Sequence, residues 1–178
     1  MELILWRHAE AVDSSPDMAR ELSAKGSLQA QKMAVFLRQH LPANTRILVS
    51  PATRTRQTVS ALTDQFTVVN SLAPNASAHA ILQAARWPNG LAHSSHPNLP
   101  PAGEGANASL REHKNLGNDT VLIVGHQPTL GAVAALLLGS AETSLSIKKG
   151  ALWWFSRRER DDSAQTTLRL VITPDMLD

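Results

Sequence analysis

Polar side chains with the chemistry to handle a phosphoryl group follow three separate apolar runs of this chain. Arg7 and His8 come directly after the first run, Ser50 after the second, and His126 one residue after the third. Arginine carries a permanent positive charge and a planar guanidinium that matches phosphate oxygens. Neutral histidine can act as a nucleophile or a general base near pH 7. These residue types together indicate phosphoryl chemistry.

The apolar runs at 2–6, 46–49 and 120–124 are predicted to be strands buried on both faces, because they show no alternation of apolar and polar residues. Helical patterns between them, the first over 24–40 after an N-cap at Ser23, imply that the strands run parallel. Their carboxyl ends should therefore meet at one edge of the sheet, where ligands bind in open α/β folds.

A second helix is predicted after the second strand, with Ser50 as N-cap and Pro51 as its first residue. Arg54 lies in its first turn beside an apolar stripe, and Arg56 is rotated by about 200° from it. Arg54 is therefore expected near the sheet edge, and Arg56 in solvent. A later helix over 129–138 should point its N-terminus to the same edge, which favours an anion there.

The remaining patterns complete an α/β fold. They predict a short strand at 66–69, a helix at 77–86, and a C-terminal hairpin of strands at 149–155 and 167–172, joined by a charged turn over 156–164. The expected architecture is a three-layer sandwich: a mostly parallel central sheet, helices on both faces and an antiparallel strand near the C-terminal edge. We expect a single domain over 1–178, with a loop insertion at about 89–118.

Composition excludes several classes of function. The 178 residues contain no cysteine, so disulfides, thiolate catalysis and cysteine-ligated zinc are excluded. A net charge of +2 is too small to indicate nucleic-acid binding, and no apolar stretch approaches the roughly 18 residues of a membrane span. His93 and His96 lack acidic or thiol partners at ligand spacing, so we expect no metal and no cofactor. A cytoplasmic protein is expected.

Four ordered blocks resemble the histidine phosphatase superfamily. They are Leu5-Trp6-Arg7-His8-Ala9-Glu10-Ala11, Arg20-x-Leu22-Ser23-x-x-Gly26, Val49-Ser50-Pro51-x-x-Arg54-x-x-Gln57-Thr58 and Val124-Gly125-His126-Gln127-Pro128. Their spacing is most similar to the short SixA-type phosphohistidine phosphatases, and the resemblance covers about 1–86 and 119–172. One departure is Ala9, which stands where the Arg-His-Gly signature has glycine and removes easy access to positive φ.

The resemblance implies a phosphoglycerate mutase-like fold and a metal-independent hydrolase. His8 would be the nucleophile and would become transiently phosphorylated. Arg7, Arg54 and His126 would hold the phosphoryl oxygens, with Arg20 as a further contact. The substrate would be a phosphohistidine-containing protein, a component of a phosphotransfer or histidine-kinase system.

Two other functions stay open on the sequence. One is a broader phosphomonoesterase or a mutase acting on small phosphorylated metabolites, and the other is a non-catalytic phosphate-binding module. The resemblance implies that family members that cleave phosphate esters also use a carboxylic acid to protonate the leaving alkoxide. Glu10 is the first candidate for this general acid, ahead of Asp13, Asp17 and Glu21, but none of the four lies in an apolar setting that would raise its pKa. A carboxylate such as Glu104 from the 89–118 loop is a further alternative.

Overall fold

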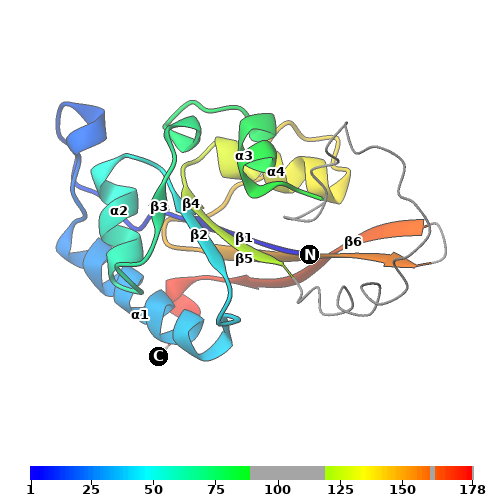
Figure 1. Cartoon of the computed structure of the whole chain (residues 1–178). Helices are drawn as coiled ribbons and strands as arrows, with labels where there is room; N and C mark the ends of the chain where they lie inside the picture. Colours follow the sequence, from blue (N-terminus) through cyan, green and yellow to red (C-terminus); the bar gives the residue numbers. More distant parts are fainter. Residues whose placement is uncertain (89–118, 161–162, 178) are drawn as a thin grey trace, which may run out of the picture.

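The computed structural model describes residues 1–88, 119–160 and 163–177 (Figure 1). A single six-stranded sheet, in the order β3-β2-β4-β1-β5-β6, forms its centre. The strands are β1 (Glu2–Arg7), β2 (Arg46–Val49), β3 (Thr67–Val68), β4 (Thr120–Gly125), β5 (Leu152–Arg160) and β6 (Ser163–Ile172). β1, β2, β3 and β4 are parallel, while β5 and β6 are antiparallel to their neighbours. The predicted α/β class is confirmed.

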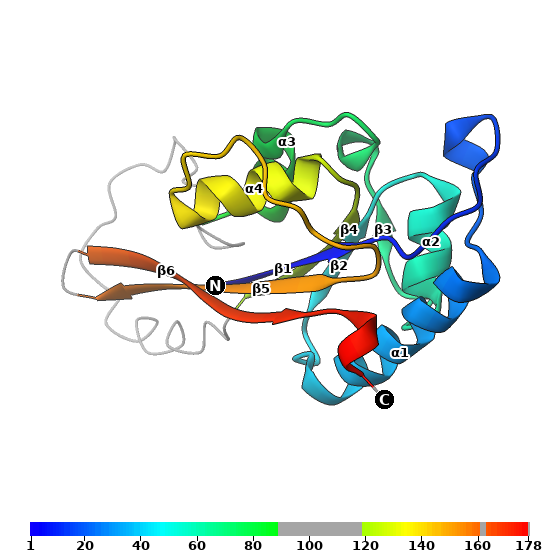
Figure 2. The ribbon, with the colours of Figure 1, turned by 180° about the vertical axis from the view of Figure 1, so that it is seen from behind.

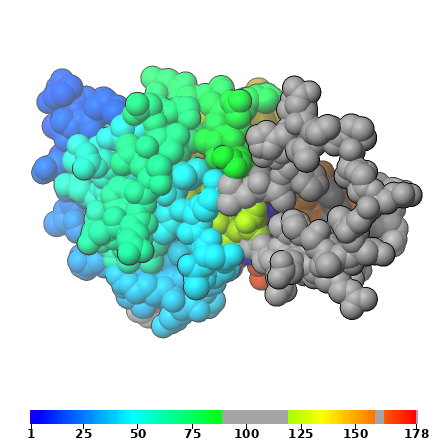
Figure 3. Space-filling model, in the orientation of Figure 1, coloured from blue at the N-terminus to red at the C-terminus, as the bar shows by residue number. Residues whose placement is uncertain are grey.

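Helices cover both faces of this sheet, as Figures 1 and 2 show. They are α1 (Ala24–His40), α2 (Thr53–Ser60), α3 (Ala78–Ala85) and α4 (Thr129–Leu138), with the short 3-10 turns η1 (Asp17–Ala19), η2 (Asn70–Leu72) and η3 (Pro174–Met176). In the space-filling view, the chain from β2 to α3 (cyan to green) forms a continuous surface on one side of the molecule (Figure 3).

The alternation of side chains along β1 divides the core into two layers. Leu3 and Leu5 pack with residues of α3 and α4 on one face. Ile4 and Trp6 pack with residues of α1 and α2 on the other. All four side chains are fully buried, because a central parallel strand is covered on both faces. This burial holds the carboxyl end of β1, and the residues that follow it, in a fixed position.

The helices predicted at 24–40 and 129–138 match α1 and α4, and Ser23 caps α1 by accepting a hydrogen bond from the Gly26 amide (3.0 Å). The helix after the second strand, however, begins at Thr53 and not at Ser50-Pro51. Its N-cap is Ala52, which makes no side-chain cap. The Ser50 hydroxyl lies 2.7 Å from His126 Nε2 and accepts a hydrogen bond from the Ala52 amide (3.4 Å), so it contacts residue 52 before the helix begins.

The C-terminal hairpin is longer than predicted. β5 extends to Arg160 and β6 begins at Ser163, so most of the expected charged turn over 156–164 is strand. Antiparallel pairing continues from Ser156–Thr167 to Arg160–Ser163, and backbone hydrogen bonds of this kind do not require apolar side chains. The short strand predicted at 66–69 is observed as β3, in which residues 67–68 pair with β2.

Residues 89–118, the predicted loop insertion, lie outside the described residues, as do His93, His96 and Glu104. Among the described residues, no helix has the length and hydropathy needed to cross a membrane.

Candidate active site

The carboxyl ends of β1, β2 and β4 are joined by backbone hydrogen bonds made by the polar residues that follow them. The His8 amide donates to the Gly125 carbonyl (3.0 Å), and the Ser50 amide donates to the Val124 carbonyl (3.1 Å). His8, Ser50 and His126 therefore lie side by side although they are far apart in the sequence. This is the convergence that the parallel topology predicted.

The His8 ring is held in one tautomer. It is 9% exposed, and its Nδ1 lies 2.7 Å from the Ala9 carbonyl oxygen. A carbonyl oxygen can only accept, so Nδ1 carries the proton and Nε2 keeps its lone pair. Burial, together with the cationic Arg54 and Arg7, lowers the pKa of His8 to about 4. At pH 7 the ring is therefore neutral, with Nε2 available as a nucleophile.

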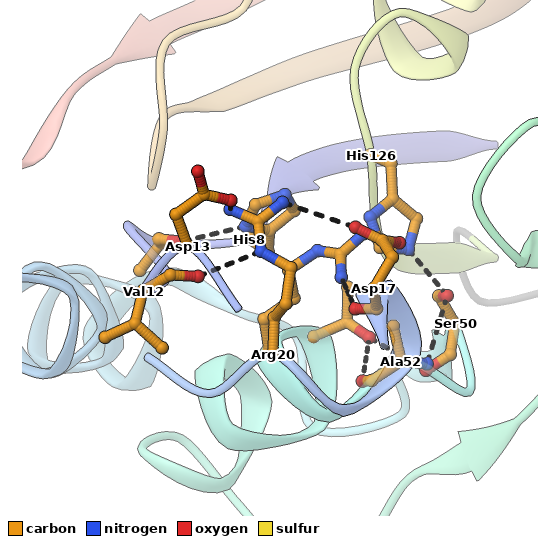
Figure 4. Close-up of polar contacts among 11 residues, drawn as sticks. His8, Val12, Asp13, Asp17, Arg20, Ser50, Ala52 and His126 are labelled. Atoms are coloured by element: carbon orange, nitrogen blue, oxygen red, sulfur yellow. Dashed lines mark hydrogen bonds and ion pairs between the residues drawn. The ribbon is translucent and has the colours of Figure 1, made fainter. Parts of the chain in front are cut away.

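His126 lies against His8, with ring centroids 5.2 Å apart (Figure 4). Its Nε2 is 2.7 Å from the Ser50 hydroxyl, while its buried Nδ1 has no hydrogen-bond partner among the described residues. Burial and the adjacent His8 lower the pKa of His126 to about 3, so this ring is also neutral at pH 7. If Nε2 accepts from the Ser50 hydroxyl, Nδ1 carries a proton that it can donate to an anion.

Arg7 connects the site to the segment before β5. Its NH1 donates to the Ile147 carbonyl at 2.6 Å, and the Gly150 amide donates to the His8 carbonyl at 3.1 Å. The Nε of Arg7 is buried without a hydrogen-bond partner among the described residues. A buried, unpaired donor on a cation beside a neutral imidazole is suited to an anionic ligand.

Arg54 is almost completely buried, with 4% exposure, whereas Arg56 is exposed, so the predicted phase of the second helix is confirmed. The Arg54 NH1 and NH2 donate to the carbonyl (2.6 Å) and to Oδ2 (3.0 Å) of Asp17, respectively. As for Arg7, its Nε is buried and has no partner within the described part of the chain.

The glycine missing from the signature is not needed in this backbone. Ala9 is fully buried, and the positive φ values of described residues other than glycine fall at Asn75 and Arg86. The Ala9 amide donates to the Thr58 hydroxyl (3.1 Å), which itself donates to the Arg54 carbonyl (2.6 Å). Thr58 thereby ties the residue after His8 to the helix that carries Arg54.

Arg20 lies on the outer side of Asp17. Its NH1 donates to Asp17 Oδ1 (3.2 Å), its Nε donates to the Val12 carbonyl (2.9 Å), and Asp13 is 3.8 Å away (Figure 4). Arg20 and Arg54 are therefore linked by the Asp17 carboxylate, to which both donate. Sequence reasoning considered Asp17 as an acid and missed its pairing with Arg54. The Asp-x-x-Arg spacing of residues 17 and 20 could have indicated a local ion pair, but nothing in the sequence pointed to Arg54.

The groups around Glu10 stabilise its ionised form, whereas a general acid must hold a proton. The Ser23 hydroxyl donates to its Oε1 (3.0 Å), and Lys25 Nζ lies 3.6 Å from Oε2. The hydrogen bond from Ser23 is the largest of the effects that lower its pKa. Because a general acid at neutral pH needs a raised pKa, this geometry favours the ionised carboxylate.

The described residues contain no group of three or more histidine, cysteine, aspartate or glutamate side chains that could hold a metal ion. The polar groups that converge at the strand ends are two neutral imidazoles and two guanidiniums, to which Asp17 adds one carboxylate. Such a set can bind a phosphoryl group and offer it a nucleophile.

The chain is similar to known phosphatases in sequence and in fold. The model of the histidine phosphatase superfamily (branch 1) matches residues 3–75. A phosphohistidine phosphatase SixA homologue of Haemophilus influenzae is 29% identical over 153 residues, which cover 78% of each chain. The structure of the protein histidine phosphatase SixA complexed with tungstate has a TM-score of 0.67, with 24% identity and 99% of each chain covered. The structure of phosphoserine phosphatase from Entamoeba histolytica has a TM-score of 0.58 and 17% identity, and the match covers 96% of this chain and 95% of that one.

Proposed function

We propose that this chain, which is similar to the histidine phosphatase superfamily over residues 3–75 and to a SixA homologue, removes the phosphoryl group from a phosphohistidine protein through a phospho-His8 intermediate. The partner would be a component of a phosphotransfer or histidine-kinase system. The observation that carries the proposal is the hydrogen bond from His8 Nδ1 to the Ala9 carbonyl, which leaves Nε2 with its lone pair.

In the first step, His8 Nε2 attacks phosphorus and the P–N bond to the substrate imidazole breaks. The bonding electrons leave with the substrate ring, whose other nitrogen already carries a proton, so the ring departs neutral. His8 becomes a phosphorylated imidazolium. The Ala9 carbonyl, which accepts from Nδ1–H, stabilises that positive charge.

In the second step, water attacks the phosphorus of phospho-His8 and the P–Nε2 bond breaks. Both protons of the water leave with the product, dihydrogen phosphate, and His8 returns to its neutral Nδ1–H tautomer. Arg7, Arg54 and His126 hold the phosphoryl oxygens in both steps. Phosphoryl transfer asks a protein mainly for such positioning and charge stabilisation, so these residues are sufficient.

The chemistry of the leaving group supports phosphohistidine over an ester. An alkoxide leaves poorly, and the proton delivered to it by a general acid is commonly worth about 10²–10⁴ in rate. Glu10 is held ionised by Ser23 and Lys25, and Asp17 is paired with two arginines. The imidazole of a phosphohistidine whose other nitrogen carries a proton leaves as a neutral ring without such help, so P–N cleavage is favoured over P–O cleavage.

The test compares the rates on a phosphohistidine protein, a phosphoserine peptide and a small sugar phosphate, with and without a chelator. We expect a clear preference for phosphohistidine, unchanged by the chelator, and rapid quench should leave labelled phosphate on His8. Comparable kcat/KM values on phosphohistidine and on the alkyl phosphate, with the alkyl rate lost in Glu10→Gln, would instead establish a general phosphomonoesterase.

A further inference from the structure

A groove of about 660 Å³ lies next to the candidate active site and shares Arg7 with it. Two lysines of α1, Lys25 and Lys32, line it, and so do Lys148 and Lys149 from the segment before β5. All four lysine side chains belong to exposed residues. We call this surface the lysine groove.

The position of the lysine groove is set by contacts with the active site. The Arg7 guanidinium donates to the Ile147 carbonyl and the Gly150 amide donates to the His8 carbonyl, so the segment that carries Lys148 and Lys149 is tied to the end of β1 from both sides. Lys149 is also one of the cations that, after burial and the nearer arginines, lower the pKa of His8. A protein whose phosphoryl group reached His8 would therefore place its neighbouring surface against these lysines.

Charge is concentrated in this groove. Five basic side chains line it, Arg7 and the four lysines, together with two acidic ones, Glu10 and Asp175, which gives a net charge of +3. The whole chain has 17 basic and 15 acidic side chains, so 12 basic and 13 acidic ones remain elsewhere and nearly cancel. The protein therefore combines a small net charge with a strongly positive surface beside the candidate active site.

The α1 side of the groove has the form of a docking surface. Lys25 and Lys32 are seven residues apart on the helix, which is about 10 Å along its axis. Between them Leu28, also in the groove, is 61% exposed. An exposed apolar side chain flanked by like charges suits a partner surface that offers an apolar contact surrounded by carboxylates.

We propose that the lysine groove docks an acidic surface of the protein substrate, next to its phosphohistidine. This inference rests on the proposed function and deepens it, because it names the chemistry by which the phosphatase selects its substrate. Charge complementarity of this kind acts mainly on the rate of encounter and on selectivity. The effect should therefore appear in kcat/KM and fall with rising salt.

The experiment uses two synthetic phosphohistidine peptides, one flanked by glutamates and the other by glutamines, together with free phosphohistidine. We expect the wild-type kcat/KM to be about tenfold higher on the glutamate peptide at low salt, with the ratio approaching one at high salt. The double variant Lys32→Glu/Lys148→Glu should lose this preference, while its rate on free phosphohistidine stays unchanged.

The matched control is Arg56→Glu/Arg158→Glu, which makes the same change in charge at exposed residues outside the groove. Arg158 lies two residues beyond Ser156, the partner of Glu2, and hence past the end of β1 opposite to His8. The control should keep the preference for glutamates. Equal rates on the two peptides, or an equal loss in both double variants, would overturn the docking proposal. Failure to hydrolyse all three phosphohistidine compounds, with activity on alkyl phosphates, would refute the proposed function instead.

Discussion

At the scale of single residues, the site depends on how each cation and imidazole is partnered. His8 is neutral and held in one tautomer, and His126 is neutral with one unpaired nitrogen. Arg7 donates to the protein through NH1, and Arg54 through NH1 and NH2. In both arginines the buried Nε has no partner within the described residues. These unpaired donors are the groups that the proposed mechanism assigns to the phosphoryl oxygens.

Two arginines of the same helix give a direct test of that assignment. Arg54→Ala should lose at least about two orders of magnitude in kcat/KM, because a buried donor to the transition state is removed. Arg56→Ala should change the rate little, since Arg56 is exposed. Steady-state kinetics on phosphohistidine measure both. Equal losses would mean that Arg54 does not contact the phosphoryl group.

If Arg54 binds the phosphoryl group as proposed, Asp17 competes with that group for its guanidinium. Its carboxylate lies 3.0 Å from Arg54 NH2, and like charges that meet at one guanidinium oppose each other. Asp17→Asn should therefore strengthen inhibition by inorganic phosphate by about tenfold, which corresponds to about 1.4 kcal/mol. The backbone contact from Arg54 NH1 to the Asp17 carbonyl does not depend on that side chain.

The control for this prediction is Asp13→Asn, because the Asp13 side chain is fully exposed and lies 3.8 Å from Arg20, not from Arg54. It should leave the inhibition constant of phosphate unchanged. Weaker inhibition in Asp17→Asn would show that Asp17 orients Arg54 for the anion and does not compete with it.

At the scale of elements, the packing of α1 against the segment after β1 positions His8. A Cβ at Gly26 would lie 1.9 Å from the Glu10 carbonyl oxygen, so only glycine fits at this approach. The Ser23 amide donates to that same carbonyl (3.0 Å). The first turn of α1 is thereby held against the backbone two residues beyond His8.

Gly26→Ala should accordingly destabilise the protein by about 1–3 kcal/mol or more, because helix and backbone must move apart. Urea unfolding measures this loss, and a lower kcat on phosphohistidine would report the displacement of the His8 segment. Gln31→Ala, an exposed position on the same helix, serves as the control and should change neither quantity appreciably. A stable and fully active Gly26→Ala protein would contradict this account of the packing.

At the scale of the whole molecule, two buried neutral histidines make stability depend on pH. In the unfolded chain a histidine has a pKa of about 6.5, whereas folding lowers the values to about 4 for His8 and about 3 for His126. Between pH 6.5 and these lower pKa values, the unfolded state binds protons that the folded state does not. The free energy of unfolding should therefore fall as the pH is lowered through 6.5.

Each of the two histidines should account for a loss on the order of 2 kcal/mol between pH 7.5 and pH 5, since one pKa unit corresponds to about 1.4 kcal/mol. Urea unfolding at both pH values measures the loss, and His8→Gln should reduce it. His79→Gln, which removes an exposed histidine, is the matched control. An identical pH dependence in wild type and His8→Gln would show that His8 titrates normally in the folded protein.

Also at this scale, most of the framework could be predicted from the sequence. The strands at 2–6 and 120–124 are apolar without interruption, and Ser23 and Gly139 mark the start of α1 and the end of α4. Because parallel strands joined through helices end at one edge, the convergence of His8 and His126 followed from these local signals. The second helix was predicted to start at Ser50-Pro51 because serine is a good N-cap residue, whereas it starts at Thr53 with Ala52 as N-cap.

The sequence by itself indicated most of the elements and the convergence of His8 with His126, since apolar runs, helix caps and the alternation of strands with helices are local patterns. Only the tertiary structure decided the tautomer of His8, the ionised state of Glu10, the pairing of Asp17 with Arg54, and the lysine groove. Each of these depends on burial or on distances between side chains of different elements. Such distances arise only when the layers pack, and pKa values and hydrogen-bond partners change with them.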